Sequence, residues 1–204
     1  MNSIETSNLT KTFRTGAGKI EALSSVNISI PASSITALTG PNGAGKTTLL
    51  KMLSGLVLQT SGTMKITGKI GLAYNPETSF YPQLTLKENL SFFGALFRAD
   101  TEKTTGVCSQ LELTDYLNTK FVFCSSGIRQ RLALARALLN SPEILLVDEP
   151  TKSLDAQSAG KILSLLSSVN KQQGTTILFA THNENEIEKL SASRIRLKNG
   201  KIEQ

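Results

Sequence analysis

The stretch "GPNGAGKTT", residues 40–48, determines the fold that we expect for this chain. It lies between a short strand-like run, residues 33–39, and a leucine-rich segment with helical spacing, residues 46–56. A glycine, four further residues and then Gly-Lys-Thr between a strand and a helix are typical of a phosphate-binding loop, because backbone N–H groups and the helix N-terminus surround phosphate oxygens. The predicted loop consists of Gly40, Pro41, Asn42, Gly43, Ala44, Gly45, Lys46, Thr47 and Thr48.

A near copy of this loop, "TGAGKI", occupies residues 15–20 and lacks two of the required groups. The position five residues before its second glycine is Phe13, and its Lys19 is followed by a residue without a hydroxyl group. In the second copy, Lys46 would reach the β- and γ-phosphates, and the Thr47 hydroxyl would bind Mg²⁺. We therefore predict that Lys46 binds a nucleotide, and that Lys19 lies at the tip of a hairpin.

A pair of adjacent carboxylates follows the apolar run of "ILLVDEP", residues 144–150. The apolar residues predict a buried strand, and Asp148 and Glu149 come at its carboxyl end, where ligands gather in open parallel sheets. Burying two adjacent carboxylates at such a place costs free energy unless one of them faces a cation and the other a water molecule. We predict that Asp148 contacts Mg²⁺ and that Glu149 faces the water; a solvated turn is the alternative.

Strand-like and helix-like segments alternate along the chain, which predicts an α/β fold with helices covering a buried sheet. The strand-like segments are residues 21–30, 69–75, 143–149 and 175–181, the helix-like ones are 86–97 and 159–169, and residues 194–204 form two short strands around an Asn-Gly turn. The length of 204 residues suits one domain, residues 1–204.

Composition excludes some classes of function. Two cysteines and one histidine without metal-ligand spacing argue against a zinc site and indicate a reducing compartment. No signal-peptide pattern and no run of about 18 apolar residues occurs, so another chain must provide any membrane span. The net charge of +6 permits an anionic partner, but the basic residues are scattered, and a general surface potential is the simpler interpretation.

Further segments occur in the order found in ATP-binding cassettes of the ABC superfamily, which the chain resembles from about Ile4 to its end. "CSSGIRQR", residues 124–131, resembles the family signature, whose usual form is LSGGQ. "SLDA", residues 153–156, is similar to the D-loop, and "ATHN", residues 180–183, to the segment with the switch histidine. Phe13 falls where the family places an aromatic ring against adenine.

This resemblance implies a P-loop NTPase core of mostly parallel sheet flanked by helices, a small antiparallel β subdomain, and a helical subdomain at about residues 84–140. It implies ATP and Mg²⁺ as cofactors, Glu149 as general base, and His182 as the residue that holds the catalytic water. The remaining cofactor-binding residues that it implies are Phe13, Ser125, Gly127 and Asp155, of which Ser125 and Gly127 act on the nucleotide held by a second copy. By itself, the start of the signature segment is more typical of an ordinary capped helix, because serine is common at helix starts.

The chain departs from the family pattern at several places. In "AYNPETSF", residues 73–80, Glu77 stands where the family has glutamine, and we expect this carboxylate near Mg²⁺ and the attacking water, where it can still bind the metal. In the signature, Cys124, Ser126 and Ile128 replace the usual leucine, glycine and glutamine. The β subdomain is shorter than in most relatives.

Residues 80–97 resemble the helical subdomain of drug, polysaccharide and haem exporters. We expect most of the large apolar side chains among Phe92, Phe93, Leu96 and Phe97 to form a core stripe, with any exposed remainder forming a groove. The function that the resemblance favours is that of an ATP-hydrolysing subunit. Two copies, or one copy and a homologous cassette, would sandwich two Mg-ATP head to tail at the cytoplasmic face of the membrane. They would power a separate integral-membrane permease, with export as the favoured direction.

Two alternatives remain open. One is a non-transport ATPase of the same superfamily that acts on ribosomes or nucleic acid, which the positive charge would suit; such relatives usually carry two cassettes or a coiled-coil insertion, so no direct nucleic-acid partner is expected. The other is a non-hydrolysing subunit whose nucleotide only holds an assembly together, which Glu77 and the altered signature suggest. The presence of Glu149 and His182 argues against it.

Overall fold

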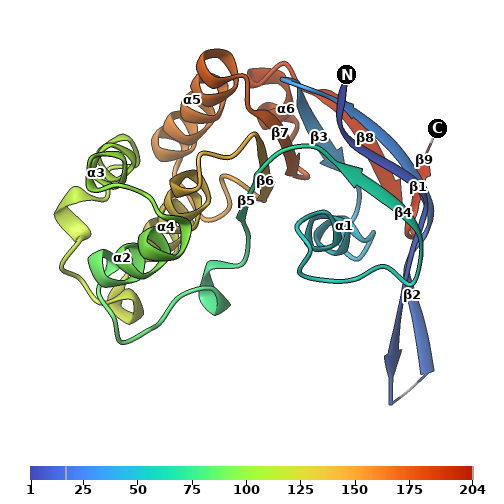
Figure 1. Ribbon diagram of the computed structural model, residues 1–204, viewed down its shortest axis with the longest axis horizontal. Coiled ribbons are helices and arrows are strands. Elements are labelled where there is room, and N and C mark those ends of the chain that lie inside the picture. The colour runs from blue at the N-terminus through green and yellow to red at the C-terminus, as the bar shows by residue number, and fades with distance from the viewer. Residues whose placement is uncertain (17, 204) are drawn as a thin grey trace.

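The computed structural model describes residues 1–16 and 18–203, which form two sheets (Figure 1). The larger sheet has the strand order β5 (Ile70–Ala73), β6 (Ile144–Asp148), β7 (Thr176–Ala180), β3 (Ile35–Thr39), β8 (Ser193–Lys198) and β9 (Lys201–Glu203). All neighbours are parallel except β8 and β9, which form the predicted terminal hairpin. This arrangement confirms the predicted α/β fold; Gln204 lies outside the described residues.

The smaller sheet is antiparallel, with the order β2 (Gly18–Pro31), β1 (Asn2–Thr15) and β4 (Ser61–Ile66). Strands β1 and β2 form a long hairpin that projects beyond the rest of the molecule (Figure 1). Thr15 pairs with Gly18 at its end, so the near copy of the loop does lie at a hairpin tip, as predicted; Ala17 is outside the described residues. Residues 67–69 alone connect β4 to β5, which accounts for the short β subdomain.

Helix α1 (Lys46–Leu53) lies between the two sheets (Figure 1). Its Leu49 and Leu50 are buried in one apolar cluster together with Ile4 of β1 and Leu146 of β6. Because both sheets pack against this short helix, the loop that precedes it is held from two sides.

The opposite face of the larger sheet is covered by helices. Helices α4 (Ser126–Leu139) and α5 (Ala156–Gln173) lie against the strands, whereas α2 (Leu86–Phe97) and α3 (Thr101–Gln110) pack on α4, farther from the sheet (Figure 1). Helix α6 (Glu184–Lys189) follows β7, and the 3-10 turns are η1 (Pro76–Thr78), η2 (Thr114–Tyr116) and η3 (Phe121–Phe123). Alternate residues of β6 divide between the two cores: Ile144 and Leu146 belong to the cluster with α1, and Leu145 and Val147 to the cluster with the covering helices. This alternation is what a strand buried on both faces requires.

Helix α2 differs in part from its prediction. Phe93 and Phe97 pack against the core, but the side chains of Phe92 and Leu96 are 46% and 65% exposed. Half of this stripe, rather than most of it, therefore packs on the core, and Phe92 and Leu96 are the exposed remainder, because α2 packs on α4 along one side and its other side faces solvent. Within residues 1–16 and 18–203, no helix is both long enough and apolar enough to cross a membrane.

Candidate nucleotide-binding site

The loop before α1 can be built only with glycine at two of its positions. A Cβ atom on Gly40 would lie 2.0 Å from the carbonyl oxygen of Leu197, and one on Gly45 would lie 2.6 Å from that of Ala22. Gly45 also has a φ of 107° and precedes a helix whose first turn holds no acidic residue. The positive end of the helix dipole is therefore not offset by its own first turn, which favours an anion.

Lys46 begins α1 and is nearly buried, with 7% of its surface exposed. Its Nζ donates hydrogen bonds to the carbonyl oxygens of Gly40, at 2.7 Å, and Pro41, at 3.1 Å. Both acceptors are neutral, so the ammonium charge remains available to phosphate oxygens at the same loop.

A hydroxyl and a carboxylate meet next to this lysine. The Thr47 hydroxyl donates a 2.7 Å hydrogen bond to Oδ2 of Asp148, which ends β6. Burial raises the pKa of the Asp148 carboxyl; the charge of Glu149 adds to this rise, and the Thr47 hydrogen bond opposes it. A divalent cation would offset the cost of this buried charge, and oxygen ligands of this kind suit Mg²⁺. Lys46, Thr47 and Asp148 are therefore of the chemical types that suit Mg²⁺ bound together with a nucleoside triphosphate.

Glu149 is held in a strained backbone conformation with a φ of 53°, which is rare for a residue other than glycine. Its N–H donates to the carbonyl oxygen of Ala180, and its own carbonyl oxygen accepts from the Gln130 side chain at 3.0 Å. Its Oε1 lies 3.1 Å from Nδ1 of His182, at the end of the neighbouring strand β7. The Glu149 side chain is 19% exposed and the His182 side chain is 70% exposed, so the histidine reaches the carboxylate from the solvent side.

Two cavities surround these groups. One, of about 370 Å³, is lined by the phosphate loop, Asp148, Glu149 and Ile20. Ile20 pairs across the hairpin with the exposed Phe13, so the ring predicted to stack on adenine belongs to a strand pair at the rim of this cavity. Lys11 lies over the Phe13 ring, 4.9 Å from its centroid. Stacking of Phe13 on adenine stays a prediction.

The second cavity, of about 440 Å³, lies between the end of β6, the segment after β5 and the start of α4. Its lining includes Thr47, Glu77 and Ser126. The Glu77 carboxylate forms an ion pair with the guanidinium of Arg129. Glu77 therefore lies at the same cavity as the expected metal ligands, but its contact with Mg²⁺ stays a prediction.

The signature segment forms the first turn of α4. Ser125 is the N-cap of this helix and accepts a hydrogen bond from the Ile128 N–H at 3.3 Å. Gly127 is buried, and a Cβ atom there would lie 3.0 Å from Cδ2 of Leu154. Within the described chain, the cavity lining includes Ser126 but not Ser125 or Gly127. Their predicted contact with a nucleotide held by a second copy stays a prediction.

Asp155 is the N-cap of α5 and accepts a 2.9 Å hydrogen bond from the backbone N–H of Ser158. This hydrogen bond, together with one from the Ser158 hydroxyl, lowers the pKa of the Asp155 carboxyl. Asp155 thus caps a helix in the single chain, and its role toward a nucleotide stays a prediction.

Sequence reasoning missed three residues of this site: Gln130, Arg129 and Lys152. Gln130 holds the backbone of Glu149, and Lys152 lines both cavities. Arg129 and Gln130 lie inside the segment that resembles the signature, residues 124–131, but the resemblance gave a role there only to Ser125 and Gly127. Lys152 follows the acidic pair by three positions, and that spacing was the available signal.

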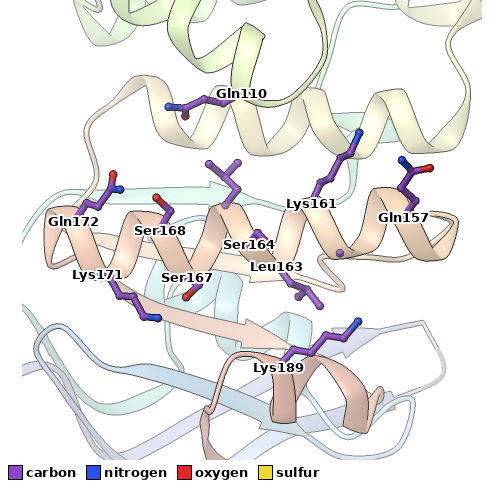
Figure 2. Close-up of a pocket in the computed structure, with 12 residues that line it drawn as sticks. Gln110, Gln157, Lys161, Leu163, Ser164, Ser167, Ser168, Lys171, Gln172 and Lys189 are labelled. Carbon is purple, nitrogen blue, oxygen red and sulfur yellow. The ribbon is translucent and has the colours of Figure 1, made fainter.

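A hollow of about 980 Å³ lies elsewhere, along α5 (Figure 2). Polar side chains, among them Gln110, Lys161, Ser168 and Lys171, line it, and it includes none of the predicted site residues. The candidate nucleotide site is therefore the pair of cavities at the phosphate loop.

Comparison with known proteins agrees with this geometry. A family model described as ABC transporter matches residues 23–152. The chain is 32% identical to the ABC transporter ATP-binding protein NatA of Bacillus subtilis, covering 90% of this chain and 80% of that protein. It is 34% identical to the iron(3+)-hydroxamate import ATP-binding protein FhuC of the same organism, over 99% of this chain and 81% of that one. A solved dimer of the ATP-binding cassette MJ0796 of Methanocaldococcus jannaschii, bound to ADP and Pi, superposes with a TM-score of 0.90 at 30% identity, covering 98% of this chain and 97% of that one. With the family model covering more than half of its length, the chain belongs to the ABC transporter family as an ATP-binding cassette.

Proposed function

We propose that two copies of this chain, or one copy and a homologous cassette, bind two Mg-ATP head to tail and hydrolyse them to drive a separate integral-membrane subunit. The observation that carries the proposal is the placement of the Glu149 carboxylate, 3.1 Å from His182 and next to the hydrogen-bonded pair of Thr47 and Asp148. The acid and the site suited to Mg²⁺ thus line one cavity, and the histidine contacts that acid.

Each residue has a role that its position supports. Lys46 binds the β- and γ-phosphates, and Thr47 and Asp148 hold Mg²⁺, which when bound neutralises charge on the phosphates. Glu149 accepts a proton from the attacking water, and His182 orients the Glu149 carboxylate from the solvent side. The hydrogen bonds from Gln130 and to Ala180 fix the backbone of Glu149, so its carboxylate is positioned before the nucleotide arrives.

The dimer is supported by two features. The first turn of α4 offers backbone N–H groups and the hydroxyl of Ser125 at a helix N-terminus, which suits the γ-phosphate of a nucleotide held by a second copy. The solved MJ0796 cassette that this chain resembles is a dimer in its complex with ADP and Pi.

The membrane partner is supported by exposed large apolar side chains on α2 and on the segments before and after it: Tyr81, Phe92, Leu96, Val122 and Phe123. The Tyr81 and Phe92 rings meet edge to face at 5.2 Å. A cavity of about 510 Å³ is lined by Phe93 and Phe97 of α2 together with other apolar side chains and polar ones that include Arg136. We propose that a cytoplasmic segment of the membrane subunit docks here.

Export is the direction that we propose, on the resemblance of residues 80–97 alone. One relative, FhuC, is named for import, so direction needs its own test. Transport of a labelled substrate by vesicles holding the complete complex, with the cassette facing outward, decides it: uptake into these vesicles indicates export.

The decisive experiment on the ATPase compares the natural chain with Glu149→Gln. We expect multiple-turnover ATP hydrolysis by the natural chain, loss of turnover by about 10² or more in the variant, and a stable Mg-ATP-dependent dimer of that variant. Absence of both turnover and a nucleotide-dependent dimer would overturn the proposal.

The membrane partner is tested by a pull-down. Tagged Glu149→Gln protein, held with Mg-ATP, should recover a membrane protein from detergent-solubilised membranes of its host. Recovery of ribosomes or nucleic acid would favour the non-transport alternative.

A further inference from the structure

We propose that the ion pair between Glu77 and Arg129 positions the first turn of α4 at the nucleotide cavity, and that Glu77 acts through Arg129 rather than through Mg²⁺. Arg129 is then a positioning residue, and the glutamate in place of the family's glutamine is its partner. The inference rests on the proposed function, since the first turn of α4 matters only if it meets a nucleotide in the dimer.

Arg129 is a largely enclosed cation with one carboxylate beside it. Its side chain is 21% exposed, and its Nε is buried without a hydrogen-bond partner in the described chain. Its Nη2 donates to the carbonyl oxygen of Val122 at 2.9 Å, and its guanidinium lies 4.9 Å from the centroid of the Phe121 ring. Neither contact supplies a negative charge, so the Glu77 carboxylate balances the guanidinium.

The pair connects two walls of the 440 Å³ cavity. Glu77 belongs to η1, which follows β5, and Arg129 belongs to the first turn of α4. The next residue of α4, Gln130, donates to the carbonyl oxygen of Glu149. Two consecutive side chains thus connect the start of α4 to two different segments at the carboxyl end of the sheet, and together they fix the helix start in position and direction.

A glutamine at position 77 would not replace this contact. The amide oxygen of a glutamine could still accept a hydrogen bond from the guanidinium, but it carries no negative charge and cannot offer the two equivalent oxygens of a carboxylate. A neutral amide would leave the enclosed guanidinium without a counter-charge. Conversely, the guanidinium offsets the negative charge that Glu77 adds to a cavity already lined by Asp148 and Glu149. The two residues at positions 77 and 129 are therefore chemically matched to each other.

The test measures dimerisation rather than turnover, in protein that carries Glu149→Gln. We expect Glu77→Gln and Arg129→Gln to weaken the Mg-ATP-dependent dimer by similar factors of about tenfold in sedimentation equilibrium. The double variant should be no weaker than either single variant, because both remove the same pair. The exchanged pair, Glu77→Arg with Arg129→Glu, should recover part of the affinity.

Arg131→Gln is the matched control. Arg131 lies two positions further along α4 and pairs with Glu112 at 3.1 Å, and neither residue lines the 440 Å³ cavity. This variant should keep the dimer affinity of the parent. Thermal unfolding without nucleotide, measured on every variant, separates positioning from stability: equal losses of dimer affinity in Arg129→Gln and Arg131→Gln would reduce Arg129 to a structural residue.

The other possible outcomes separate this inference from a metal-binding role of Glu77 and from a failure of the proposed function. If Glu77→Gln weakens the dimer and raises the Mg²⁺ concentration that it needs while Arg129→Gln does neither, Glu77 is a metal ligand and the inference is wrong. If both variants dimerise like the parent, the inference fails and the proposed function stands. If the parent itself forms no Mg-ATP-dependent dimer, the proposed function fails first.

Discussion

The chain contains the letters Gly-Ala-Gly-Lys twice, at residues 16–19 and 43–46, and the two copies have opposite environments. Lys19 is exposed near a hairpin tip, whereas Lys46 is nearly buried against two backbone carbonyls. A Cβ atom added to Gly18 would meet no other atom within 4 Å, whereas a Cβ atom added to Gly45 would lie 2.6 Å from a carbonyl oxygen. The sequence Gly-Ala-Gly-Lys alone is therefore not sufficient for a phosphate-binding site.

The difference lies in what precedes and follows each copy. The first lies at the exposed end of the hairpin, where Gly18 and Lys19 of β2 pair with Thr15 and Arg14 of β1, and it leads into a strand instead of a helix. The second follows β3, at the centre of the larger sheet, and leads into α1 between the two sheets. Only the second copy ends on a hydroxyl, Thr47, that reaches a carboxylate of another strand.

The largest expected effect comes from Lys46→Ala. Loss of the ammonium group removes the charge that we propose to contact the β- and γ-phosphates, so we expect steady-state ATP hydrolysis to fall by about 10² or more. A coupled assay of phosphate release measures it, and the thermal unfolding midpoint of the nucleotide-free variant verifies folding. Turnover within a factor of about two of the natural chain would show that another cation holds the phosphates.

Alanine substitutions at the second glycine of each copy compare the two loops by their effect on the stability of the protein. Gly45→Ala introduces a Cβ atom at a positive φ and against the carbonyl oxygen of Ala22, so we expect a loss of about 3 kcal/mol in the free energy of unfolding. Gly18 also has a positive φ, of 127°, but open space surrounds it, so we expect Gly18→Ala to lower the free energy of unfolding by only about 1 kcal/mol. Urea denaturation measures both. A loss at Gly18 as large as that at Gly45 would mean that backbone strain, not close packing, explains the glycines of the loop.

Much of this contrast could be predicted from the sequence. The complete loop pattern between a strand and a helix identified Lys46 and Thr47, and the apolar run before Asp148 and Glu149 predicted a buried strand that ends at the ligand edge of a parallel sheet. Such signals are local, because backbone geometry and chemistry require certain residues at fixed spacing. The structure confirms the α/β fold and brings these four residues to one cavity.

Other features depended on packing between distant segments and left no local signal. The contact of Glu149, which has a φ of 53°, with Gln130 exists because the start of α4 lies near the end of β6. The ion pair of Glu77 with Arg129 joins positions 52 residues apart. The exposed side chain of Phe92 has the same helical spacing as a core residue, and only the position of α2 at the edge of the molecule determines its exposure.

A smaller effect is expected from Asp148→Asn, which tests the carboxylate that the second copy reaches through Thr47. Burial raises the pKa of Asp148, so ionising it costs stability in the folded chain. The asparagine keeps an acceptor for Thr47 without this cost, and we expect a gain of about 1 kcal/mol in the free energy of unfolding at pH 7, with loss of Mg²⁺-dependent turnover.

The pH dependence of that gain follows from its cause. The cost is complete above the raised pKa of the folded chain and absent below the unfolded value near 3.8, where both states are protonated. The gain should therefore shrink as the pH falls through this interval. Urea denaturation of both proteins at several pH values measures it, and a gain that does not vary with pH would assign the effect to packing instead of ionisation.

The smallest effect is expected from Lys19→Ala. Lys19 is exposed, and its backbone pairs with that of Arg14 in the hairpin. The substitution lowers the net charge from +6 to +5, and Lys19 lines neither cavity at the phosphate loop. ATP affinity, measured by titration with a fluorescent analogue at physiological salt, should match that of the natural chain. A small loss at low salt that disappears at high salt would be a general effect of surface charge, because added ions screen it. A loss comparable to that of Lys46→Ala, persisting at high salt, would show that the hairpin tip contacts the nucleotide and that the two copies share one site.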